Sequence, residues 1–251
     1  MPDGGVEVAK ISTWDRYQYP LDCAIIYTDI YANKCSTKLA RYVTIEVTRL
    51  KPSERFTQLT TQTGLFNIQA ISNIPSIMQR GLLSNERAKS ICHASIAMNE
   101  VQERREIVKV PNGLRLHQYA NLYFDPRNPM LSRKRDQNEE ICILRFSRDV
   151  LDLKGVVVSD RNASSDYVAF YPPEMGLEQI DFKLVYAHYW TDEDYYEQLR
   201  KKSIKCAEVL VPYVIPFDYV LGAAVVSKNA AEKLKLTGFD REIYVKPELF
   251  F

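Results

Sequence analysis

Apolar and polar residues alternate in several short runs of this chain, which is the pattern of half-buried β-strands. In the first part of the chain, residues 42–47 (YVTIEV) alternate most clearly, and residues 24–27 (AIIY) form a second run. The stretch over residues 51–64 is polar, rich in Thr and Gln, and opens with a proline that breaks the preceding run. We therefore expect residues 1–60 to form an N-terminal extension or a small β-rich subdomain, with a linker leading to a main domain over residues 61–251.

The main domain mixes strand and helix patterns. Strands are predicted at 65–71, 140–146, 155–159, 205–212, 219–227 and 243–245, and the strongly apolar run at 140–146 is expected to be central. Helices are predicted over 73–80, between Ser72 as cap and Gly81 as stop, over 95–105, and over 192–201 with Thr191 as cap. Because these elements follow no regular βαβ order, we expect an α+β fold with a mixed central β core and flanking helices.

Residues 116–135 combine an aromatic strand with a stiff turn. The strand ends at the sequence DPRNP, where two prolines fix the backbone and remove two donors. Tyr123, Arg127 and Met130 are thereby held at a rigid strand end, and a basic run (RKR) follows. An aromatic shelf with a basic rim suits a flat ring and a phosphate, but a buried edge strand with a solvated turn explains the same residues.

Composition excludes several classes of protein. With 46% hydrophobic and 26% charged residues the chain is an ordinary globular protein, and a net charge of +1 provides no overall field for nucleic acid. Five scattered cysteines without a CxxC pair indicate a reducing compartment, and three histidines without ligand spacing predict no metal site. We see neither a signal peptide nor a long apolar run, so we expect a cytoplasmic protein with no membrane partner.

Two charged residues stand out as candidates for chemistry. Glu208 lies in the apolar strand AEVLVP, where it either faces solvent or points into a pocket. Arg105 lies near a predicted helix end, where a cation favours the helix dipole but could also hold a pyrophosphate. A cationic stretch over residues 200–205 precedes Glu208 and could hold an anionic polymer. The glycine-rich signatures of P-loop and Rossmann sites are absent, which does not exclude NAD.

Five motifs then occur in a specific order: NIPSIMQRGLLS, VQERR, LHQYANLYFDPRNPML, SDRNAS and KCAEVLVP. In this order, over residues 65–227, they resemble the DarT family of DNA ADP-ribosyltransferases. The resemblance implies an ADP-ribosyltransferase fold and the transfer of ADP-ribose from NAD, a co-substrate, to a base in single-stranded DNA. It also implies that the enzyme, a glycosyltransferase that moves a pentosyl group, is the toxin of a toxin–antitoxin pair, whose antitoxin is an ADP-ribose-removing hydrolase.

The resemblance further implies roles for individual residues. Glu208 matches the catalytic glutamate, Arg105 the catalytic arginine, and the segment 192–205 the substrate-recognition loop. The expected NAD contacts are Tyr123 and Met130 at the nicotinamide end, with Asn67, Gln69 and Asn73 on the first strand and after it. The expected DNA contacts are Arg127, Lys201, Lys202 and Lys205, with nearby tyrosines stacking on bases.

One departure from the family pattern keeps the target open. Residues 67–69 read Asn-Ile-Gln where the family commonly has His-Ile-Thr, and an asparagine can hydrogen-bond NAD but cannot carry a proton. The target base therefore stays open between thymine and guanine. A related transferase acting on RNA or protein, and a non-catalytic nucleic-acid-binding module on the same fold, remain alternatives.

Overall fold

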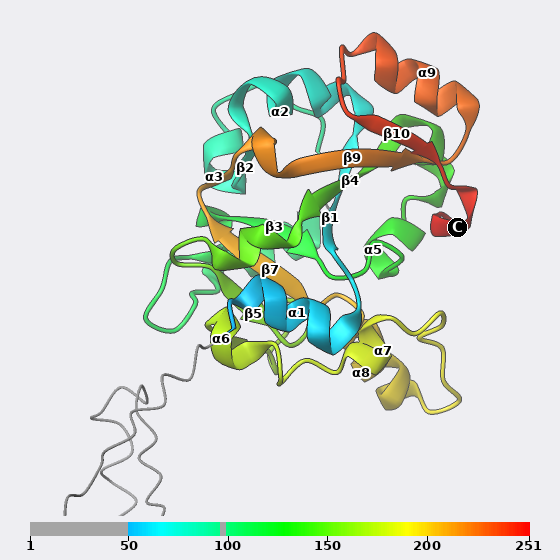
Figure 1. Ribbon diagram of the computed structural model, residues 1–251. Coiled ribbons are helices and arrows are strands. Elements are labelled where there is room, and N and C mark those ends of the chain that lie inside the picture. The colour runs from blue at the N-terminus through cyan, green and yellow to red at the C-terminus, as the bar shows by residue number, and fades with distance from the viewer. Residues whose placement is uncertain (1–49, 96–98) are drawn as a thin grey trace, which may run out of the picture. The chain divides into compact units, whose positions relative to one another are not determined.

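The computed structural model describes residues 50–95 and 99–251, which Figure 1 draws as a coloured ribbon. Residues Leu50–Phe251 form one compact unit. The strands predicted at 24–27 and 42–47 lie outside the described residues, as does part of the helix predicted over 95–105. The separate character of the first part of the chain therefore stays a prediction.

A mixed β-sheet forms the centre of this unit (Figure 1). Within the described residues it has eight strands in the order β10-β9-β4-β1-β3-β7-β5-β6. These strands are β1 (Gly64–Ala70), β3 (Tyr119–Tyr123), β4 (Ile141–Ser147), β5 (Val157–Ser159), β6 (Phe170–Tyr171), β7 (Glu208–Pro212), β9 (Val220–Val225) and β10 (Glu242–Val245). Neighbours run antiparallel except β9 and β10, which are parallel, and β2 (Leu82–Leu83) pairs with β8 (Val214–Ile215) in a separate ribbon. The α+β prediction is confirmed.

Short helices surround the sheet. They are α1 (Pro52–Thr60), α2 (Ile74–Arg80), α3 (Asn85–Ala88), α4 (Asn99–Ile107), α5 (Pro129–Ser132), α6 (Pro173–Gly176), α7 (Phe182–Val185), α8 (Tyr195–Ile204) and α9 (Lys228–Leu236). Helix α9 packs against β4, β9 and β10, at one end of the strand order (Figure 1). The loops between β3 and β4 and between β6 and β7 hold α5, α7 and α8, so these helices gather around the ends of β3 and β7.

The strands with the strongest apolar patterns are the best predicted. Strand β4 lies between β9 and β1, is buried along most of its length, and pairs with all seven residues of β1. Strand β7 lies between β3 and β5, and its first four residues are buried. A strand covered on both faces reads as a continuous apolar run, so the predicted central position of residues 140–146 is confirmed.

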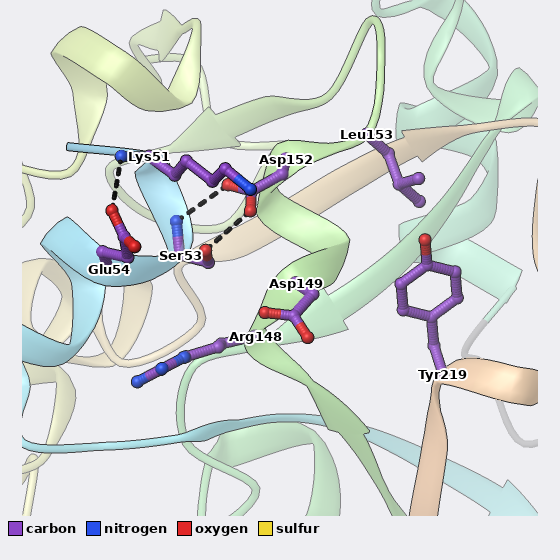
Figure 2. A pocket seen from close by; sticks show the side chains of 8 residues that line it. All are labelled: Lys51, Ser53, Glu54, Arg148, Asp149, Asp152, Leu153 and Tyr219. Atoms are coloured by element: carbon purple, nitrogen blue, oxygen red, sulfur yellow. Dashed lines mark hydrogen bonds between the residues drawn. The ribbon is translucent and has the colours of Figure 1, made fainter. Parts of the chain in front are cut away.

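The predicted linker after Lys51 is wrong, because this stretch contains helix α1. Pro52 occupies the first turn, where a missing N–H costs nothing, so it begins a helix rather than separating two strands. Figure 2 shows how the helix is anchored: the Ser53 backbone N–H donates to Asp152 at 2.9 Å and its hydroxyl donates to the same carboxylate at 2.6 Å. The side chain of Phe56 on the next turn is fully buried in the core.

Two predicted helix starts are also wrong, for local reasons. A 3-10 turn over Ile71–Asn73 precedes α2, so Ser72 does not cap the helix, although Gly81 ends it at φ +77° as predicted. Helix α8 begins three residues later than expected, because Asp194 caps it by accepting a hydrogen bond from the Glu197 N–H at 2.8 Å.

Helix α1 is expected to contribute directly to stability. Phe56→Ala removes a fully buried aromatic ring and should lower the free energy of unfolding by about 3–5 kcal/mol. Leu59→Ala, on the same helix but 38% exposed, should change it by less than about 1 kcal/mol. Urea unfolding followed by circular dichroism measures both variants. Equal losses for the two would show that α1 does not pack as described.

Candidate active site

A cavity of about 400 Å³ lies where α4 meets the ends of β3 and β7. Its volume falls in the range of small-molecule sites, about 300–1,000 Å³. Eight of the residues predicted for the site line it: Asn67, Gln69, Asn73, Arg105, Tyr123, Met130, Lys202 and Glu208. Residues from distant parts of the sequence therefore meet at one hollow.

Glu208 is the buried carboxylate of this cavity. It opens β7, opposite Tyr123 at the end of β3 and Ser159 at the end of β5, because antiparallel neighbours bring these strand ends together. It is only 1% exposed, so the alternative of a solvated strand face is excluded. Its Oε1 accepts a hydrogen bond from the Ala163 N–H at 3.0 Å, and its own N–H donates to Ser159 Oγ at 3.2 Å.

Arg105 supplies the countercharge from helix α4. Its Nη1 donates to Oε1 and Oε2 of Glu208 at 2.9 and 3.0 Å, and its side chain is 9% exposed. Burial by itself would lower the pKa of Arg105, but the charge and hydrogen bonds of Glu208 outweigh it and raise that pKa. The guanidinium is therefore a fixed cation, and it holds the carboxylate in one orientation.

The proline turn after β3 builds another wall. Asn128 is fully buried, and its Oδ1 accepts from the N–H groups of Met130 and Leu131 at 3.0 and 3.1 Å, which caps α5. Met130 is thereby fixed in the cavity wall, which Tyr123 also lines, and both residues pack against the same hydrophobic cluster. Burial raises the pKa of Tyr123 well above its ordinary value, so its hydroxyl stays protonated.

The amide side chains predicted to bind the cofactor differ in which hydrogen-bonding atoms remain unpaired. Asn67 donates to the Asn121 carbonyl at 2.9 Å, and its buried Oδ1 meets no partner among residues 50–95 and 99–251. Asn73 holds the chain at Ala94 through two hydrogen bonds, and its Nδ2 also donates to Gln69 Oε1 at 3.1 Å. Asn67 thus retains an acceptor for a ligand, whereas Asn73 and Gln69 shape the wall.

The four residues predicted to contact DNA have different surroundings. Lys202 lines the cavity, and Lys201, on the same helix, pairs with Asp192. The Arg127 guanidinium lies over the Phe251 ring, 4.0 Å from its centroid, outside the cavity.

Lys205 is corrected from a DNA contact to a structural residue. It forms an ion pair with Asp125 and donates to the Val185 carbonyl, and at 1% exposure its ammonium does not reach the surface where a DNA phosphate would bind.

The described part of the chain contains neither a metal-binding cluster nor a membrane-spanning helix. Its His, Cys, Asp and Glu side chains form no group of three or more that could hold a metal ion. Its helices include none that is long and apolar enough to cross a membrane.

Comparison with known proteins decides the family. Residues 66–251 match the family described as "ssDNA thymidine ADP-ribosyltransferase, DarT". The chain belongs to the DarT family. This confirms the resemblance found in the sequence and, with it, the expected ADP-ribosyltransferase fold and the class of NAD-dependent DNA ADP-ribosyltransferase.

The named relatives of this DarT chain include a DNA ADP-ribosyl transferase and a fusion of such a transferase with a glycohydrolase. A DNA ADP-ribosyl transferase of Thermus sp. (strain 2.9) is 31% identical over 68% of this chain and 85% of its own. A DNA ADP-ribosyl transferase-DNA ADP-ribosyl glycohydrolase fusion protein of Thermosipho africanus (strain H17ap60334) is 29% identical over 74% of this chain and 48% of its own, so this chain spans about half of it. The structure of Thermus sp. 2.9 DarT in complex with ADP-ribosylated ssDNA aligns with a TM-score of 0.65 at 26% identity, over 75% of this chain and 96% of that one.

Some residues of this cavity were not predicted from the sequence. The motif SDRNAS carried the resemblance, but we expected no contact from it, and it contributes the Ala163 N–H to Glu208 and Asn162 to the cavity wall. Asn121 and Gln102 also line the cavity. Their positions inside recognised motifs were the available signal. The Ala163 contact could not be predicted from residue type, because its functional group is a backbone N–H, which nearly every residue has.

Cys206 provides a chemical test of the cavity wall. Burial is the main cause that raises the pKa of this thiol to about 12, and the nearby charge of Glu208 is the second cause. At pH 8 only about one thiol in ten thousand is therefore ionised. Native protein treated with iodoacetamide at pH 8 should be alkylated at the exposed Cys92 and spared at Cys206. Peptide mass mapping measures both, with urea-unfolded protein as control. Comparable native rates would contradict the described burial.

Proposed function

We propose that this protein transfers ADP-ribose from NAD to a thymine or guanine base in single-stranded DNA and that this activity makes it a toxin. The observation that carries the proposal is the buried Arg105–Glu208 pair at the wall of the cavity, on the DarT fold. Transfer breaks the bond between nicotinamide and ribose and forms a bond from the same ribose carbon to a nitrogen of the base. The base loses a proton, and nicotinamide leaves with the bonding electron pair.

Glu208 is suited to stabilise the charge that develops in this reaction. Cleavage of the nicotinamide–ribose bond gives the ribose oxocarbenium character, and a carboxylate fixed beforehand stabilises that charge without reorganisation. The three hydrogen bonds from Arg105 and Ala163 provide this fixation. The carboxylate is also an acceptor in the cavity wall that can take the proton of the attacking base.

Arg105 is assigned an orienting role rather than that of a base. Its pKa is raised and its guanidinium is paired, so it has no capacity to accept a proton near neutral pH. A cation at this place can hold the pyrophosphate and the base while it fixes Glu208.

The remaining cavity residues fit NAD as the co-substrate. The unsatisfied Asn67 Oδ1 would be matched by a ligand donor such as an amide or a ribose hydroxyl. Tyr123 and Met130 provide an aromatic ring and a thioether in the wall of the same cavity, which suits the nicotinamide end. Gln69 and Asn73 complete this wall.

The segment over residues 186–204, which follows α7 and includes α8, is the proposed DNA contact. Tyr189, Tyr195 and Tyr196 are 71, 65 and 80% exposed there, and the rings of the last two meet edge to face, 5.8 Å apart. Exposed rings on the same segment as Lys202 would combine base stacking with a phosphate contact, which is how proteins bind single strands. Lys201, on the same helix, is a second candidate for a phosphate.

Two further features follow from the proposed activity. A hydrolase that removes ADP-ribose from DNA is the expected antitoxin, because a relative of this chain is named as a fusion of transferase and DNA ADP-ribosyl glycohydrolase. We propose a cytoplasmic location, because the named relatives come from bacteria, in which NAD and DNA share the cytoplasm.

The central test is the adduct itself. Wild-type protein with NAD should add one ADP-ribose mass to single-stranded oligonucleotides, and oligonucleotides containing thymine or guanine as the sole variable base identify the target. Glu208→Gln keeps the shape but removes the charge and should lower the rate by at least about 100-fold, the scale of one lost electrostatic group. Glu232→Gln on the exposed face of α9 is the matched control. An adduct on RNA or protein but not on DNA would refute the proposed substrate.

The stacking surface has a separate test. Tyr196→Ala should raise the KM for the oligonucleotide about 5- to 150-fold, because stacking on one aromatic side chain is worth about 1–3 kcal/mol. The KM for NAD should stay unchanged. Steady-state rates at varied oligonucleotide concentration measure the effect, and Tyr244→Ala on edge strand β10 serves as control. An unchanged oligonucleotide KM would remove Tyr196 from the DNA surface.

A further inference from the structure

Lys205 is a buried charge outside the reaction centre. Its side chain is 1% exposed, and its ammonium makes an ion pair with Asp125 and donates to the Val185 carbonyl at 2.6 Å. An apolar residue at such a place would avoid the loss of hydration that a buried ammonium suffers, so the charge calls for an explanation beyond packing.

The partners of Lys205 show which parts it joins. Val185 ends α7 and Lys205 directly follows α8, so one ammonium ties together the two ends of the segment over residues 186–204. This segment carries the exposed tyrosines 189, 195 and 196 and, through Lys202, borders the cavity. Because its two ends are held together, segment 186–204 has less freedom to move as a whole relative to the rest of the fold.

Asp125 connects that loop base to the cavity wall. It opens the proline turn after β3, and its second oxygen accepts from the Arg127 N–H at 3.0 Å. Its backbone carbonyl accepts from Asn128, the residue that caps α5 and so positions Met130. The same carboxylate therefore shapes the turn and receives the lysine.

Glu208 is held independently of this contact. Its position is set by pairing with β3 and β5 and by hydrogen bonds from Arg105 and Ala163. Loss of the Lys205–Asp125 pair should thus displace the segment 186–204 more than the carboxylate.

We propose that Lys205 is a positioning residue for the DNA substrate: through Asp125 and Val185 it fixes segment 186–204 beside the cavity and does not contact DNA itself. The inference rests on the proposed function, since it specifies how the DNA-binding segment is aligned with the site. It assigns to Lys205 an effect on DNA recognition that is separate from the binding of NAD.

The test uses a charge-neutral double variant, Lys205→Met with Asp125→Asn. The methionine keeps a long side chain, and the asparagine can still accept from the Arg127 N–H, so no unpaired charge is buried. We expect cooperative unfolding and a KM for NAD within about twofold of wild type. The oligonucleotide KM should rise at least about tenfold, because a displacement of about 1 Å can cost about 100-fold in rate.

The salt dependence of oligonucleotide binding separates positioning from direct contact. Removal of a phosphate contact reduces the slope of log Kd against log salt concentration by about 1, so the double variant should bind more weakly with an unchanged slope. Lys233→Met, which removes a surface ion-pair cation on α9, should match wild type in both KM values. Equal rises in both KM values, an unchanged oligonucleotide KM, or a reduced slope would each overturn the proposal.

Failure of the proposed function is distinguishable from failure of this inference. If wild-type protein modifies no oligonucleotide, the proposed function is wrong, and fluorescence anisotropy with the same labelled oligonucleotide still decides the role of Lys205. An equal oligonucleotide affinity of wild type and double variant then overturns the positioning role, and absence of any oligonucleotide binding by the wild type overturns both.

Discussion

The buried ion pair between Arg105 and Glu208 is the interaction on which the rest of the site depends. Removing two charges from water is favourable only when each finds its partner in good geometry and the remaining lone pairs are satisfied. Here the carboxylate meets a guanidinium from α4 and the N–H of Ala163 from the turn after β5. Helix, strand and turn must all be in place at once, so the folded unit itself fixes the orientation of the Glu208 carboxylate.

The second buried pair, Lys205 with Asp125, lies at the same end of β3 and β7. Arg105 and Glu208 are 103 residues apart in sequence, and Lys205 and Asp125 are 80 apart. Pairs of such long range form only when the sheet has its register, since β3 and β7 set Tyr123 opposite Glu208. The two pairs therefore have different roles: one fixes the Glu208 carboxylate, and the other holds together the loop and the turn near it.

The sequence predicted those features that depend on local chemistry. The alternating or apolar runs of β1, β4 and β7 identify strands because side chains two residues apart share a face. Glu208 and Arg105 stood out from their local sequence, motif order then implied a role for each, and they do meet in the cavity. Lys205 was misassigned because its type and its neighbours match those of the half-exposed Lys201, while its burial is decided by Asp125 in another part of the chain. The helix α1 was missed because Pro52 either interrupts a strand or begins a helix, and only the packing of Phe56 selects the second.

Helix α1 also shows that the site depends on residues beyond those that define the family. The DarT match begins at residue 66, whereas the ring of Phe56 lies 5.6 Å from Phe124 and 5.9 Å from Phe182, centroid to centroid. Phe124 directly precedes the proline turn, and Phe182 opens α7, so this aromatic cluster lies beneath the two segments that Lys205 joins. Apolar contacts of this kind do not fix a specific orientation, whereas the ion pair between Lys205 and Asp125 does. Helix α1, which lies before the start of the family match, thus supplies packing to the base of segment 186–204, and the Lys205–Asp125 pair from the motifs fixes that base.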